Sequence, residues 1–141
     1  MPEEILSLRT PYQFAKYFFT DNFLDHIVEQ TILYSVQQRP EKPVYTDRAE
    51  IESFFSTLIW MSMMNLPRSR LYWNLKFRFT QIAEQLSVNR WEEIKRFIHF
   101  NNNNNMPPKD DHSYDKLYKL RPLLDHFRSR SLTIPKKNIS H

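Results

Sequence analysis

The apolar positions in the first part of the chain recur at helical spacing and predict two helices. Thr10 and Pro11 suit the start of a helix over about residues 11–18, because threonine caps helices well and proline fits the first helical position. A second helix is predicted over residues 22–37, with Asp21 as its N-cap and apolar side chains every three or four residues. The two prolines that follow require a loop.

The clearest periodicity belongs to a third helix, which starts at Thr46 or Asp47 and ends before Pro67. Its core-facing positions follow a spacing of i, i+3, i+4, i+7, i+8 and i+11 and are Ile51, Phe54, Phe55, Leu58, Ile59 and Ser62. Large apolar residues occupy the other faces as well. We therefore expect this helix to be buried nearly all round, at the centre of the core.

The second half of the chain is less regular. Alternation over residues 75–79 indicates a short extended segment, and a short helix and a longer one are expected over residues 80–86 and 87–100. A run of asparagines predicts a loop, and a last helical stretch covers about residues 111–130, in which Pro122 should kink or restart the helix. The tail is expected to hold a loop and the start of a strand.

These elements indicate a mainly α fold with a single helical domain. The domain is expected over residues 11–130, between an N-terminal tail of residues 1–10 and a C-terminal tail of residues 131–141. A chain of 141 residues fits one domain and can bury a core of its own.

The composition excludes several classes of site. The chain contains no glycine, so a P-loop, a dinucleotide-binding turn and a nucleophile elbow are all excluded, because each needs glycine where the backbone approaches a ligand or takes a positive φ. It contains no cysteine, which excludes disulfides and thiolate zinc sites. No apolar stretch reaches the roughly 20 residues of a membrane span, and no secretory signal is evident, so no membrane partner is expected.

The charge is distributed unevenly along the chain. Residues 1–66 carry 5 Lys and Arg against 9 Asp and Glu, whereas residues 67–141 carry 15 against 7. The two parts therefore have net charges of −4 and +8. A basic half suggests a polyanionic partner such as DNA, although a well-solvated surface would give the same balance.

Residues 80–98 partly resemble a helix-turn-helix motif. The small and apolar residues of a first helix and turn are present, but the apolar pair of the second helix, Ile94 and Phe97, lies one position away from its usual place. The alternative is two amphipathic helices packed at an angle. If the motif is real, Asn89, Arg90 and Lys95 would face DNA, because the second helix enters the major groove.

Arginines and aromatic residues alternate over residues 68–79, where Arg68 and Arg70 precede Tyr72 and Trp73. Such interleaving suits phosphate contacts combined with base stacking. The same pattern arises when aromatic residues lie in the core and cations on the solvated face.

The acidic residues Asp110, Asp111 and Asp115 precede the last helical stretch. Paired carboxylates can hold two metal ions in nucleic-acid enzymes, but helix capping explains these three more simply. The histidines form no metal-binding pair at helical spacing. We therefore expect no metal site, no cofactor and no catalytic residue.

Motifs along nearly the whole chain resemble those of piggyBac-type transposases and the proteins derived from them. The resemblance is carried by Pro11-Tyr12-Gln13-Phe14, Ile27-Val28-Glu29-Gln30-Thr31, the long apolar helix ending in Leu66-Pro67, Asn89-Arg90-Trp91-Glu92-Glu93-Ile94 and Asp115-Lys116-Leu117-Tyr118-Lys119-Leu120-Arg121-Pro122-Leu123-Leu124-Asp125. Departures from the family pattern are Ser56 and Ser62, where the family has glycines, and Trp91, where it has phenylalanine.

This resemblance implies the N-terminal dimerisation and DNA-binding domain of the family, without the RNase H-like catalytic domain. The first catalytic carboxylate of the family follows a strand that would begin near residues 138–141, so the chain is expected not to be an enzyme. Expected partners are DNA, a second copy of the chain or a full-length transposase, and the expected location is the nucleus.

The resemblance and the basic second half together predict a domesticated transposon protein that binds DNA without catalysis. The alternatives are a helical protein-interaction module that does not bind DNA, and a decayed transposon remnant. The residues predicted to contact DNA are Arg68, Arg70, Asn89, Arg90, Lys95, Arg96, Lys116, Lys119 and Arg121.

Overall fold

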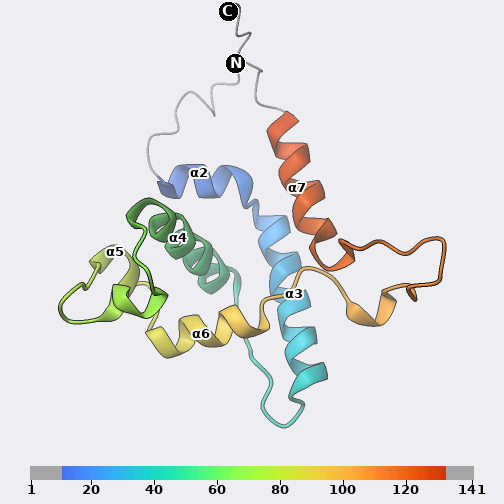
Figure 1. The fold of residues 1–141 in the computed structure, drawn as a ribbon, viewed down its shortest axis with the longest axis horizontal. Coiled ribbons are helices and arrows are strands. Elements are labelled where there is room, and N and C mark those ends of the chain that lie inside the picture. Colours follow the sequence, from blue (N-terminus) through green and yellow to red (C-terminus); the bar gives the residue numbers. More distant parts are fainter. Residues whose placement is uncertain (1–10, 133–141) are drawn as a thin grey trace, which may run out of the picture.

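A computed structural model describes residues 11–132 of the chain. Within this range the chain forms six α-helices, three short 3-10 helices and no strand, which confirms the mainly α prediction (Figure 1). The elements are α2 (Pro11–Phe18), α3 (Asp21–Gln38), α4 (Arg48–Met64), η1 (Ser69–Trp73), α5 (Thr80–Ala83), α6 (Val88–Phe97), η2 (Asn103–Asn105), η3 (Tyr118–Leu120) and α7 (Arg121–Leu132). The predicted tail 1–10 and the strand expected near the C-terminus lie outside the described residues.

Side-chain caps fix the ends of the long helices. The α3 helix is capped by Thr20, whose hydroxyl accepts a hydrogen bond from the Phe23 amide at 3.4 Å. The prediction of Asp21 as this cap is therefore wrong by one residue. Asp47 caps α4 as expected, and α4 ends at Asn65, which adopts the left-handed conformation with φ 56°. Asparagine tolerates this conformation better than most residues.

The core lies where α3, α4 and α6 meet. Side chains from all three helices are fully buried there, with Leu24 and Ile27 from α3, Ile51 from α4 and Ile94 from α6. Trp91 also lies in this core, and its indole Nε1 donates a hydrogen bond to the buried Thr57 hydroxyl at 2.9 Å. Burial of these apolar side chains is the main favourable contribution to folding.

The first and last described helices pack against each other. The α7 helix contacts α2, and the rings of Phe18 and Phe127 meet edge to face with centroids 5.9 Å apart. Arg130 Nε donates to the Tyr17 carbonyl at 2.7 Å, and a ring nitrogen of His126 bonds to the Phe18 carbonyl. Residues more than 100 positions apart in the sequence thus close the domain.

The expectation that α4 is buried nearly all round is wrong for its second half. The first half supplies Phe54, Phe55 and Thr57 to the core, but Leu58, Met63 and Met64 are 38%, 54% and 47% exposed. Few of the described residues pack against this end of α4, although its sequence is apolar.

No extended segment forms at residues 75–79. The chain instead makes η1 and a turn, because the Tyr72 hydroxyl donates to the Met61 carbonyl and accepts from the Leu66 amide, which ties this segment to the end of α4. The Phe79 amide donates to the Tyr72 carbonyl at 3.0 Å and closes the loop. These tertiary hydrogen bonds override the local preference for a strand that the alternating residues indicate.

The other helix boundaries differ from those predicted. The α5 and α6 helices are shorter than expected, and residues 111–117 form turns instead of helix. Pro122 lies in the first turn of α7, so the helix restarts there, as the sequence indicated. No helix within residues 11–132 is long and apolar enough to span a membrane.

Candidate nucleic-acid interface

The α6 helix places its charged residues on different sides. Ser87 caps the helix by accepting a hydrogen bond from the Arg90 amide at 3.2 Å, and the buried face carries Trp91, Ile94 and Phe97. Because residues of an α-helix advance about 100° each, Arg96 points outward while Arg90 lies at the edge of the buried face. The α5 helix has four residues, so α6 alone presents a regular helical surface in this region.

Arg90 is engaged by carboxylates. Its guanidinium bonds to both carboxylate oxygens of Glu50, at 2.6 and 2.9 Å, to Glu93 at 2.7 Å and to the Tyr45 carbonyl at 2.6 Å. The Glu50 carboxylate is the main reason that the pKa of Arg90 is raised. Since Glu50 belongs to α4, Arg90 joins α6 to α4. The positive charge of Arg90 is already balanced by these carboxylates.

The other predicted DNA-contact residues differ in what they contact. Arg70 donates to the Glu92 carboxylate at 3.0 Å, although its side chain is largely exposed. Arg121 forms two bonds to Asp115, at 2.7 and 2.9 Å. Arg68 and Asn89 are exposed, and Arg68 forms no ion pair within the described range.

Lys95 and Arg96 are exposed on α6. Each cation lies near an aromatic ring of its own helix, Lys95 at 5.4 Å from the Trp91 centroid and Arg96 at 5.3 Å from the Phe97 centroid. Neither forms an ion pair with any residue between 11 and 132. Arg96 also lines a hollow of about 300 Å³ together with Arg39, at the end of α3, and the acidic residue Glu41.

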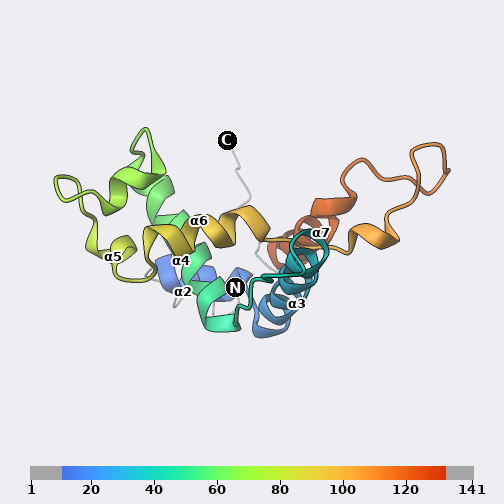
Figure 2. The same cartoon turned by 90° about the horizontal axis from the view of Figure 1, so that it is seen from below.

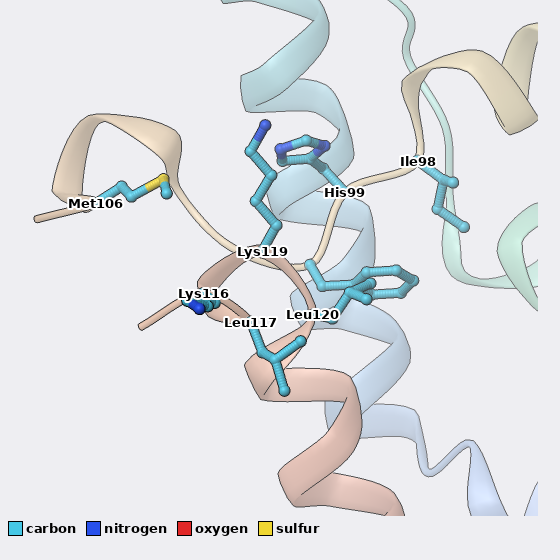
Figure 3. Close-up of a pocket in the computed structure, with 8 residues that line it drawn as sticks. Ile98, His99, Met106, Lys116, Leu117, Lys119 and Leu120 are labelled. Carbon is cyan, nitrogen blue, oxygen red and sulfur yellow. The ribbon is translucent and has the colours of Figure 1, made fainter. Parts of the chain in front are cut away.

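Lys116 and Lys119 line a second, larger hollow of about 530 Å³ (Figure 3). Its lining residues are Ile98, His99, Phe100, Met106, Lys116, Leu117, Lys119 and Leu120. The Lys119 side chain runs toward His99 in Figure 3. None of these eight residues is acidic, and within the described part of the chain neither lysine has an ion-pair partner.

The two hollows adjoin each other through a pair of stacked rings. Tyr34 lines the smaller hollow, His99 lines the larger one, and their rings are parallel with centroids 3.9 Å apart. His99 Nε2 also forms a hydrogen bond with the Asn103 side-chain oxygen, at 3.1 Å. Arg96 on one side and the two lysines on the other therefore belong to one region.

Two of the acidic residues before α7, Asp111 and Asp115, have structural partners. Asp111 accepts hydrogen bonds from the amide and hydroxyl of Ser113, which lower its pKa. Arg121 and the Leu117 amide lower the pKa of Asp115 to about 2. Among residues 11–132 no group of three or more acidic or histidine side chains could hold a metal ion.

The predicted contact residues are spread along the molecule. In Figures 1 and 2 the green segment with η1 and α5 lies at the opposite end from the orange segment of residues 100–120. The structure therefore brings Lys116 and Lys119 together, with Arg96 nearby, and leaves Arg68 and Arg70 at the far end. Sequence reasoning missed Arg39 and His99, since nothing local connects either residue to the lysines.

The comparisons with known proteins agree with a transposase origin. No solved structure matches the chain. Residues 10–135 match the family described as Transposase IS4, and this match covers nearly the whole chain, including every helix that the structure describes. The chain therefore belongs to the Transposase IS4 family.

Proposed function

We propose that this chain is a piggyBac-type, transposase-derived domain that binds DNA in the nucleus without catalysing strand cleavage. The order and spacing of the motifs described above support the piggyBac assignment within the transposase family. The engagement of Asp111 and Asp115 in local hydrogen bonds supports a role without metal-dependent catalysis.

The observation that carries DNA binding is the acid-free hollow with Lys116 and Lys119 on it, beside Arg96. These three cations are exposed, and among the described residues none is neutralised by a carboxylate. Cations without partners can displace the counterions of DNA phosphates, which gives binding that weakens with salt. Arg90 and Arg121 are not part of this contact set, because each would have to break an ion pair to bind a phosphate. The cost of breaking that pair would offset the free energy gained from the phosphate contact.

The experiment is fluorescence anisotropy of the purified 141-residue chain with a labelled DNA duplex across a salt series. Each substitution of Arg96, Lys116 or Lys119 by Gln should weaken binding and lower the salt slope by about 1. The matched control is Lys76→Gln, because this exposed lysine lies between η1 and α5. Figure 1 shows that segment at the other end of the molecule. Equal losses in the control and the three variants would refute this contact set, and no binding at low salt would refute DNA binding altogether.

A second candidate function is self-association through an apolar groove between α4 and α7. The groove of about 310 Å³ is lined by Phe19, Phe55, Leu58, Ile59, Ser62, Leu123 and Phe127. Exposed apolar surface of this kind is typical of protein-protein contacts. Sedimentation should show a dimer that dissociates in Leu58→Glu but not in Leu75→Glu, a control at a residue that is 94% exposed. A monomeric wild-type chain that also fails to bind DNA would leave the decayed remnant as the better interpretation.

A further inference from the structure

The hollow beside Lys116 and Lys119 has an apolar interior that phosphate contacts do not explain. Leu117 and Leu120 line it and are 46% and 45% exposed. Ile98 and Phe100, which pack against the core, line it from the other segment. Phosphate groups gain nothing from such a surface, since they are fully charged and strongly hydrated.

The walls of the hollow are tied together by hydrogen bonds. The Asn101 side-chain amide donates to the Tyr118 carbonyl at 2.9 Å, and the Tyr118 hydroxyl donates to the Asn102 carbonyl at 2.7 Å. These reciprocal bonds join the loop after α6 to η3. The bidentate pair of Arg121 and Asp115 fixes the turn that precedes η3. A hollow held in this way is largely formed before a ligand arrives, which reduces the entropic cost of binding.

We propose that this hollow binds one unpaired nucleotide of DNA, with the base against the apolar interior and the adjoining phosphates at Lys116 and Lys119. The inference rests on the proposed DNA binding and names the form of DNA that the hollow takes. In a duplex the apolar face of a paired base is covered by the bases stacked above and below it. Only an unstacked base can therefore place that face against the interior of the hollow. The volume of about 530 Å³ lies within the range of small-ligand sites, roughly 300–1000 Å³.

The chemistry of the lining matches a nucleotide. Two lysines without carboxylate partners complement the phosphates, and apolar side chains offer a surface for a base face, which every base possesses. The lining side chains able to bond a base edge are few, so we expect little preference among the four bases. An apolar protein side chain would fit the interior but would leave the two lysines without a counterpart.

The experiment compares three labelled duplexes of the same sequence by fluorescence anisotropy. One is blunt and fully paired, one carries a single extrahelical base, and one carries an extrahelical abasic site at the same position. The last two have the same charge and a similar backbone distortion, so their difference reports the base alone. We expect the extrahelical base to bind about fivefold or more tightly than the abasic site, the low end of what stacking one base contributes.

Two sets of variants separate the base from the phosphates. The double variant Leu117→Ser with Leu120→Ser keeps the charge and should abolish the preference for the extrahelical base over the abasic site. Leu75→Ser, at a residue that is 94% exposed elsewhere, is its control and should change neither. Lys116→Gln with Lys119→Gln should weaken binding of the base and abasic duplexes by similar factors. Circular dichroism of each variant checks that the helices are retained.

The outcomes distinguish this inference from the proposed function. Salt-dependent binding of the blunt duplex with equal affinities for the base and abasic duplexes would overturn the nucleotide site and leave DNA binding intact. A base preference that survives the double leucine variant would also overturn it. No binding to any of the three duplexes would overturn both.

Discussion

The buried hydrogen bond between Trp91 and Thr57 offers a sharp test of how α6 is held on α4. The indole Nε1 donates to the Thr57 hydroxyl at 2.9 Å, and that hydroxyl donates in turn to the Phe54 carbonyl at 2.6 Å. Trp91 is 2% exposed and Thr57 is fully buried, so water does not replace a lost partner. Thr57→Val keeps the side-chain shape but leaves the indole N–H without an acceptor.

The expected cost follows from this geometry. A buried donor left without a partner costs about 1–3 kcal/mol of unfolding free energy, which is a measurable part of the roughly 5–15 kcal/mol that stabilises a typical domain. In a chain that carries Trp91→Phe the donor is absent, and Thr57→Val then removes only the bond to the Phe54 carbonyl. The two substitutions should therefore be coupled by about 1 kcal/mol or more, since packing losses cancel in a double-mutant cycle.

Urea unfolding followed by far-ultraviolet circular dichroism measures this coupling without relying on tryptophan fluorescence. Thr57→Ser is the control, because it keeps the hydroxyl and loses only a methyl group. If Thr57→Val costs the same in the wild-type chain and in Trp91→Phe, the indole bond does not stabilise the α4–α6 contact and the reasoning is refuted.

Three further predictions concern polar groups and helix ends. Arg90→Met should cost about 1–2 kcal/mol in urea unfolding, because it removes the guanidinium that bonds both the Glu50 and the Glu93 carboxylates; an unchanged urea midpoint would contradict this role. Carbon-detected NMR should give the Asp115 carboxyl a pKa of about 2, and this pKa should rise in Arg121→Gln while the Leu117 amide still holds it below the usual ~3.9. Its lowered pKa means that it stabilises the fold above pH ~4 and that this contribution is lost as the pH falls toward ~2; a pKa unaffected by Arg121→Gln would contradict the assigned cause. Asn65→Gly should leave stability within a few tenths of a kcal/mol and Asn65→Ala should lower it by ~1 kcal/mol, because only alanine is strained at φ 56°; equal melting temperatures of the two variants would count against this.

Much of the helical framework could be predicted because its signals are local. Proline breaks and capping residues located α2, α3 and α4 to within a residue or two, including the Asp47 cap. The predictions failed where distant contacts override local preference. The Tyr72 hydroxyl ties η1 to the end of α4, so the alternating segment that follows makes a turn in place of a strand.

The candidate site could be predicted only in part. The sequence located the cations, and the resemblance to transposases gave a reason to expect a polyanionic partner. The hollow could not be predicted from the sequence, because His99 and Lys119 are 20 residues apart along the chain. The hydrogen bonds of Tyr118 to Asn101 and Asn102 bring their two segments together. Nor could it find Arg39, which reaches the same region from the end of α3.

The sequence by itself determined the helical class, the breaks between helices and the excess of positive charge in the second half, because these depend on neighbours along the chain and on composition. The tertiary structure alone decided which charges remain available. Arg90 is paired with Glu50, 40 positions away, and Arg70 with Glu92, 22 positions away. Lys116 and Lys119 lie beside an apolar hollow, and neither has an ion-pair partner among residues 11–132. Both carboxylates lie far from their arginine in the sequence, so no local pattern predicts these two pairs.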